Sequence, residues 1–82
     1  MTLVELTEEL VLAVVSNKEA VGVKEFATDD PNAILIEVLI DKDDMPRVIG
    51  KGGKVINSIR TLVQASSYLK ENKLVKINVD SI

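Results

Sequence analysis

The sequence predicts a two-layer α+β sandwich in which three helices cover one face of a three-stranded sheet. Segments 33–40 and 74–79 place branched aliphatic residues at every second position, which is the period of a half-buried strand. Segments 3–17 and 54–69 instead repeat apolar residues at helical spacing. Because strands with one apolar face need helices to cover it, we expect one helical layer, with the other sheet face open to solvent.

The first half of the chain predicts a helix followed by a β-hairpin. Thr2 begins a capping-box pattern, and the apolar stripe behind it predicts a helix that ends near Ser16. Segment 20–27 predicts a strand in which Gly22 can form a bulge. A polar turn follows, so this strand should pair antiparallel with segment 33–40.

The second half predicts a short helix, a glycine turn, a long helix and a last strand. Asp44 is placed to cap the short helix at 45–47, and the long helix should run from Lys54 to about residue 69. No linker or repeat divides the chain, so we expect a single domain over residues 1–82. The predicted inward stripe of the long helix consists of Val55, Ile56, Ile59, Leu62, Val63 and Ser66.

The chain contains no histidine and no cysteine, which removes the commonest general base, the commonest metal ligand and every disulfide. We therefore expect no catalytic residue, cofactor or metal site, and a binding protein rather than an enzyme. The acids at 41, 43 and 44 are expected to cap and solubilise a loop. No apolar run approaches the ~20 residues of a membrane span, so we expect a cytoplasmic protein without membrane contact.

Charge is distributed unevenly along the chain, although the net charge is only −3. Residues 1–44 contain eleven acids against three bases, whereas residues 45–82 contain seven bases against two acids. No acid occurs between Met45 and Lys70. A basic face on an acidic body suits local phosphate binding, while the negative total weakens long-range attraction of a nucleic acid.

The glycine-rich stretch between the last two helices concentrates the features of a phosphate site. Three glycines occur within positions 50–53, with Lys51 among them and Lys54 directly after them. Backbone without side chains lets a ligand approach closely, and N–H groups at the start of a helix favour an anion. We interpret the ligand as the phosphate backbone of a single-stranded nucleic acid. A plain turn would need one left-handed residue rather than three glycines.

The order of elements around Val-Ile-Gly-x-x-Gly resembles the KH domain, in which the GXXG loop clamps about four nucleotides. Gly50 and Gly53 match the fixed glycines, and the helix and strand that precede this core resemble the bacterial, type II arrangement. Chain length and the Ile59–Leu62 segment are similar to the small KhpA family. Gly52 departs from the family, where a polar or charged residue is more usual.

The resemblance implies a cytoplasmic RNA-binding protein that acts as an RNA chaperone and post-transcriptional regulator. It also implies a homodimer, or pairing with a larger KH protein that carries a Jag domain, and a link to cell-shape and cell-wall homeostasis. The expected RNA-binding residues are Gly50, Gly52 and Gly53 for backbone access with N–H donors, Lys51 and Lys54 for charge, Arg47 and Arg60 as flanking contacts, and Ile49 as an apolar floor for bases. Val48 is expected either in the same floor or, equally, in the domain core.

The two aromatic residues, Phe26 and Tyr68, offer little base stacking, so we expect modest affinity, weak sequence preference and a need for dimerisation. The alternative function is a protein-interaction module in which nucleic-acid binding is incidental. The residue patterns fit RNA and single-stranded DNA alike, since contacts to the 2′-hydroxyl separate the two ligands.

Overall fold

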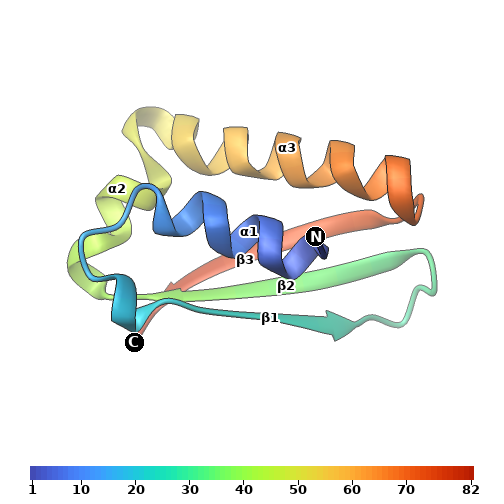
Figure 1. The fold of residues 1–82 in the computed structure, drawn as a ribbon, viewed down its shortest axis with the longest axis horizontal. Coiled ribbons are helices and arrows are strands. Elements are labelled where there is room, and N and C mark those ends of the chain that lie inside the picture. The colour runs from blue at the N-terminus through green and yellow to red at the C-terminus, as the bar shows by residue number, and fades with distance from the viewer.

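The computed structural model describes all 82 residues and confirms the predicted sandwich of three helices on a three-stranded sheet (Figure 1). Short 3-10 turns occupy Lys18–Ala20, Lys42–Asp44 and Lys51–Gly53. The helices and strands, in chain order, are α1 (Leu3–Leu12), β1 (Gly22–Ala27), β2 (Ala33–Ile40), α2 (Met45–Ile49), α3 (Lys54–Lys70) and β3 (Leu74–Ser81).

The sheet has the order β1-β2-β3, with β1 antiparallel and β3 parallel to the central strand. Pairing between β1 and β2 is unbroken from Gly22 opposite Leu39 to the hairpin end, so the predicted bulge is absent. Val23 therefore faces the helices, whereas Phe26 lies on the open face and is 47% exposed. An uninterrupted register fixes this outcome, because side chains three residues apart point to opposite faces.

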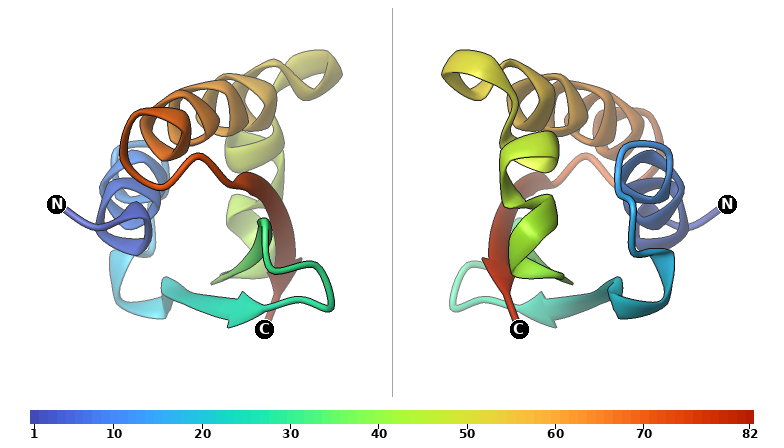
Figure 2. Two further views of the ribbon diagram at one scale, coloured as in Figure 1. Left: turned by 90° about the vertical axis from the view of Figure 1, so that its right-hand side faces the viewer. Right: turned by 90° about the vertical axis from the view of Figure 1, so that its left-hand side faces the viewer.

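The core lies between the sheet and the helices, which Figure 2 shows gathered on one side of the strands. Alternate residues of β2 are completely buried there, as the period-two pattern predicted. Helix α3 contributes three branched residues to the same layer. The buried apolar residues are Leu3, Val11, Val15, Ile34, Ile36, Val38, Ile40, Val48, Ile56, Ile59, Val63 and Ile77.

Helix α1 is shorter than predicted, because it ends at Leu12 and not near Ser16. Thr2 and Glu5 form the predicted capping box at its start. Beyond the helix, the backbone N–H groups of Ser16 and Asn17 donate to a carboxylate far along the chain, on Asp44. This contact holds residues 16 and 17 outside the helix. A local sequence pattern does not predict it, because Asp44 lies 28 residues after Ser16.

Helix α3 is the longest element and begins directly after the glycine turn. It ends at Lys70, two residues before Asn72, which takes a positive φ of 54°. Leu62 was predicted to point inward but is 53% exposed, since the buried stripe follows Ile56, Ile59 and Val63. None of the helices combines the length and the apolar character that a membrane span requires.

Candidate nucleic-acid interface

The glycine turn joins α2 to α3 and projects from one corner of the molecule, in yellow in Figure 2. Gly50 has φ 76° and ψ 170°, while Gly52 and Gly53 are left-handed at φ 63° and φ 80°. A Cβ at Gly50 would lie 2.5 Å from the Val55 side chain and 2.8 Å from its backbone nitrogen. A Cβ at Gly52 would meet nothing within 4 Å. Gly50 is therefore needed for packing, whereas Gly52 leaves the surface open.

The hydrogen bonds of this turn limit which N–H groups are available to a ligand. The Gly50 N–H donates to the Pro46 carbonyl at 2.9 Å, and the Gly53 N–H donates to the Gly50 carbonyl at 3.1 Å. The prediction that the N–H groups of these two glycines face a ligand is therefore wrong. The N–H groups of Lys51 and Gly52 follow Gly50, whose positive φ interrupts the helical hydrogen-bond pattern of α2 before it reaches them.

The cations around the turn differ in whether the protein already pairs them. Lys51 and Lys54 are exposed and form no ion pair. The single ion pair of the structure joins Arg47 Nη1 to Asp44 Oδ1 at 2.9 Å. Arg47, predicted as a flanking contact, is thus held toward the protein, although its side chain is 56% exposed. The two lysines supply the free positive charge at the turn.

Asp44 is buried and acts within the fold, which corrects the prediction that it caps α2 and solubilises a loop. Its carboxylate accepts the N–H groups of Ser16 and Asn17, each at 2.9 Å, in addition to Arg47. The donation from Asn17 and then from Ser16, with a smaller contribution from Arg47, holds the pKa of Asp44 below its ordinary value. Asp44 therefore links the segment after α1 to the start of α2.

A second carboxylate, Asp41, supports the same segment. It accepts from the Asn17 side-chain amide and from the Asp43 N–H, both at 3.0 Å, and these donors lower its pKa. No group of three or more acids converges as a metal site would require. The acids at 41 and 44 therefore bind protein groups.

The apolar floor that the sequence predicted beside the turn is mostly inside the protein. Val48 is completely buried, so of its two expected places, a floor for bases and the domain core, it occupies the core. Ile49 is half-buried and packs against the same core. Of these two residues, only Ile49 therefore retains exposed surface beside the glycines.

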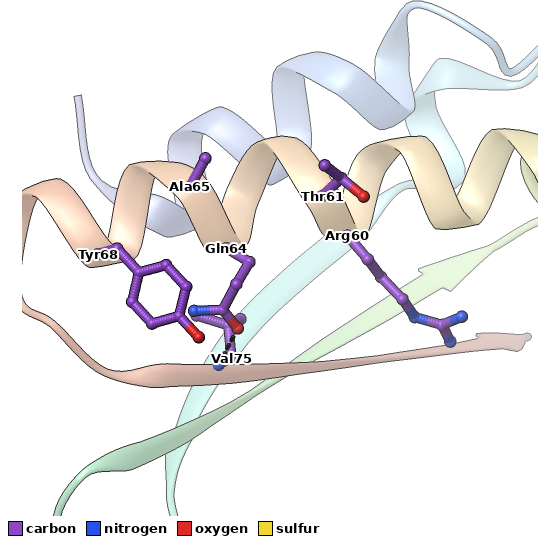
Figure 3. Close-up of a pocket in the computed structure, with 6 residues that line it drawn as sticks. All are labelled: Arg60, Thr61, Gln64, Ala65, Tyr68 and Val75. Carbon is purple, nitrogen blue, oxygen red and sulfur yellow. Dashed lines mark hydrogen bonds between the residues drawn. The ribbon is translucent and has the colours of Figure 1, made fainter.

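Arg60 lies away from the turn, in a groove between α3 and the outer edge of β3 (Figure 3). Its guanidinium donates to the Ile77 carbonyl at 3.1 Å and to the Asn57 side chain at 3.2 Å. One helical turn further, the Gln64 side-chain amide bonds both the Val75 N–H and the Lys73 carbonyl. Sequence analysis missed Gln64, because a polar residue on a helix gives no sign that it will cover a strand edge.

Comparison with known proteins identifies the family. The family model described as "KhpA/KhpB, KH domain" matches residues 4–79 of this chain. This chain belongs to the KhpA/KhpB KH-domain family. KhpA of Caldanaerobacter subterraneus subsp. tengcongensis, described as an RNA-binding protein, is 40% identical over 92% of this chain and 96% of its own length. KhpA of Clostridium perfringens, described in the same words, is 36% identical over the same shares.

A solved structure shares the fold of this chain. The crystal structure of Era in complex with MgGDPNP and nucleotides of 16S ribosomal RNA superimposes with a TM-score of 0.73 over 98% of this chain. The identity is 21%, and this chain spans 30% of the Era chain, so the likeness concerns the fold alone. The KhpA/KhpB match covers α1 through most of β3 and includes the glycine turn, which confirms the family that the sequence resembles.

Proposed function

We propose that this protein binds single-stranded RNA by seating the phosphate backbone on the turn at Gly50–Gly53, and that it serves as a cytoplasmic RNA chaperone and post-transcriptional regulator. Its relatives are described as RNA-binding proteins, which supports RNA as the ligand. The negative net charge makes binding depend on local contacts rather than on long-range attraction.

One observation carries the proposal: open backbone and unpaired cations coincide at the turn. Gly52 leaves open space where a side chain would stand, and the exposed Lys51 and Lys54 flank that space without ion-pair partners. Backbone N–H groups and lysines are common donors to phosphate oxygens. These contacts fix the position of a strand but do not read its sequence. We therefore expect weak sequence preference.

The test is a double substitution, Lys51→Asp with Gly52→Asp, titrated with single-stranded RNA. Aspartate tolerates the left-handed backbone of Gly52 better than most residues do, and a Cβ there meets nothing within 4 Å, so the fold should survive. Two carboxylates beside the phosphates should abolish RNA binding. Lys24→Asp, which reverses one exposed charge in the same direction on β1, is the control that should not. Unchanged binding by the double variant would overturn the proposal.

Pairing with a second copy, or with a larger KH protein that carries a Jag domain, is the second part of the proposal. Joining two weak sites raises the effective affinity for a longer strand. Exposed apolar side chains are available on α3, at Leu62 and Leu69, and on the open sheet face, at Phe26 and Leu39. Sedimentation of the chain with each pair replaced by aspartate would locate the contact.

The same double variant separates the two candidate functions. If it loses RNA binding and keeps its oligomeric mass, the turn belongs to the RNA site. If the oligomer dissociates as well, the turn belongs to a protein contact, and the protein is an interaction module in which nucleic-acid binding is incidental.

A further inference from the structure

The two outer edges of the sheet differ in whether the protein covers their backbone groups. Side chains of α3 bond the β3 edge at the Val75 N–H and at the Lys73 and Ile77 carbonyls. At the opposite edge, β1 is the outermost strand (Figure 1). Apart from the ladder with β2, no hydrogen bond reaches a backbone group of Gly22–Ala27. One edge is therefore covered, and the other is open to a further strand.

The outer edge of β1 has both the backbone groups and the room that an added strand needs. Alternate residues of an antiparallel edge strand direct their N–H and C=O groups away from the sheet. Every residue from Lys24 to Ala27 is exposed. This includes Ala27, although it lies opposite the buried Ile34 and so faces the helix layer. The helices therefore leave this part of the edge uncovered, and an added strand would not have to displace one.

Two side chains of opposite charge occupy the middle of β1. Lys24 lies on the open face of the sheet, whereas Glu25 lies on the helix face, opposite Ile36. Neither forms an ion pair. Charged residues on an edge strand, including one that points inward, disfavour pairing with an unmatched strand. A strand that supplies the opposite charge at each position is therefore selected over others.

A second copy of this chain does not match these charges. Two β1 edges can pair antiparallel only with both helix layers on the same side, so each residue must lie opposite a residue of the same face. The two registers that pair most of the strand then place Lys24 against Lys24 of the second copy, or Glu25 against Glu25 of the second copy. Like charges directly opposite each other destabilise a strand pair. The β1 edge therefore fits a segment of a different protein.

We propose that the outer edge of β1 binds an extended segment of another protein as an added antiparallel strand. The segment has the order apolar, basic, acidic, apolar. Its basic residue lies opposite Glu25 and its acidic residue opposite Lys24, while the two apolar residues lie opposite Phe26 and Val23. Main-chain hydrogen bonds supply the affinity, and the two charges select the partner.

This surface is separate from the proposed RNA site. The strand order β1-β2-β3 places it at the other edge of the sheet from β3 and the α3 groove. It includes neither the glycine turn nor its lysines. The protein can therefore bind RNA and a protein segment together, and the inference does not depend on RNA binding.

The experiment titrates the wild type with two synthetic peptides and follows the backbone amide signals by NMR. The matched peptide is Thr-Val-Lys-Glu-Val-Thr, and the control peptide, Thr-Val-Glu-Lys-Val-Thr, exchanges its two charged residues. At millimolar concentration the matched peptide should shift the amide signals of β1 and slow their exchange with solvent. It should bind between about fourfold and about thirtyfold more tightly than the control peptide. Equal or tighter binding of the control peptide would overturn the proposal.

A charge exchange in the protein sharpens the test. Lys24→Glu combined with Glu25→Lys keeps the net charge and changes only exposed side chains, and it should invert the preference between the two peptides. The same exchange at another exposed neighbouring pair, Lys42→Asp with Asp43→Lys, is the matched control and should leave the preference as in wild type. RNA binding should be unchanged in both variants.

Two further outcomes would contradict the proposal. If neither peptide perturbs the β1 amide signals of the wild type, the edge does not accept a strand. If these signals instead depend on the concentration of the protein alone, the edge belongs to a contact with a second copy. Both results come from the wild type, so they hold even if a variant fails to fold.

Discussion

The charged residues at the two ends of α2 differ in whether the protein already pairs them. At its start, the buried Asp44 carboxylate binds two backbone N–H groups and Arg47. Beyond its end, Lys51 and Lys54 lie at the glycine turn and have no ion-pair partner. No buried side-chain nitrogen or oxygen anywhere in the protein lacks a hydrogen-bond partner. Folding therefore pairs the charges at one end of α2 and leaves those at the other end without ion-pair partners.

The largest expected effect comes from Gly50→Ala, which attacks the glycine turn through its geometry. The backbone of Gly50 lies in a region that is essentially restricted to glycine, and other residues there cost roughly 1–3 kcal/mol. The new methyl group would also overlap the Val55 backbone and side chain. Urea denaturation should show a free energy of unfolding reduced by at least about that amount.

The control for this prediction is Gly22→Ala. Gly22 has no positive φ and open space around its Cα, so the free energy of unfolding should hardly change. Equal stability of the two alanine variants would show that Gly50 is not required for the junction between α2 and α3.

Asp44→Asn attacks the other end of α2 and should lower the melting temperature by several degrees. The asparagine side chain has one acceptor oxygen, so it cannot receive Ser16 and Asn17 as the two carboxylate oxygens do. The neighbouring Asp43→Asn makes the same charge change on an exposed residue and should leave the melting temperature almost unchanged. RNA affinity of the folded Asp44→Asn protein should stay within about twofold of wild type, because Lys51 and Lys54 are untouched.

The dependence of stability on pH should separate the same two regions. In the folded protein the pKa of Asp44 lies below its ordinary value of 3.8, chiefly because the N–H groups of Asn17 and Ser16 donate to it. A depressed pKa stabilises the fold fully above the ordinary value, and the contribution is lost as pH falls below 3.8 and through the lower pKa of the folded state. The difference in melting temperature between wild type and Asp44→Asn should therefore shrink in acid. A difference that stays constant would mean that the carboxylate charge does not stabilise the fold.

Features that depend on local residue patterns were predicted correctly, whereas features that depend on contacts between distant residues were not. Strand β2 was predicted at its observed bounds, Ala33–Ile40, because alternation is a local property of the strand. The end of α1 was predicted wrongly, because Asp44 binds Ser16 across 28 residues. The open position of Phe26 depends on the register between two strands, which a presumed bulge at Gly22 had obscured.

The same distinction applies to the candidate site. The place of the glycine turn follows from residue types alone, since three glycines and two lysines between helices are unusual. Which glycine is needed for packing does not, because the overlap at Gly50 arises from Val55 in the folded chain. The groove between α3 and β3 was not predicted either, because Gln64 and Arg60 meet β3 only after the helix packs.

The smallest expected effect compares a free cation with a paired one, in Lys54→Ala and Arg47→Ala. Lys54 forms no ion pair, so its loss should weaken RNA binding for all sequences and reduce the slope of log affinity against log salt by about 1. Arg47 is already bound to Asp44, so its loss should change that slope by clearly less. Titrations at several salt concentrations measure both slopes. An equal change of slope for Arg47→Ala and Lys54→Ala would mean that Arg47 leaves Asp44 and binds the RNA. The contrast between a paired cation at one end of α2 and free cations at the other would then be wrong.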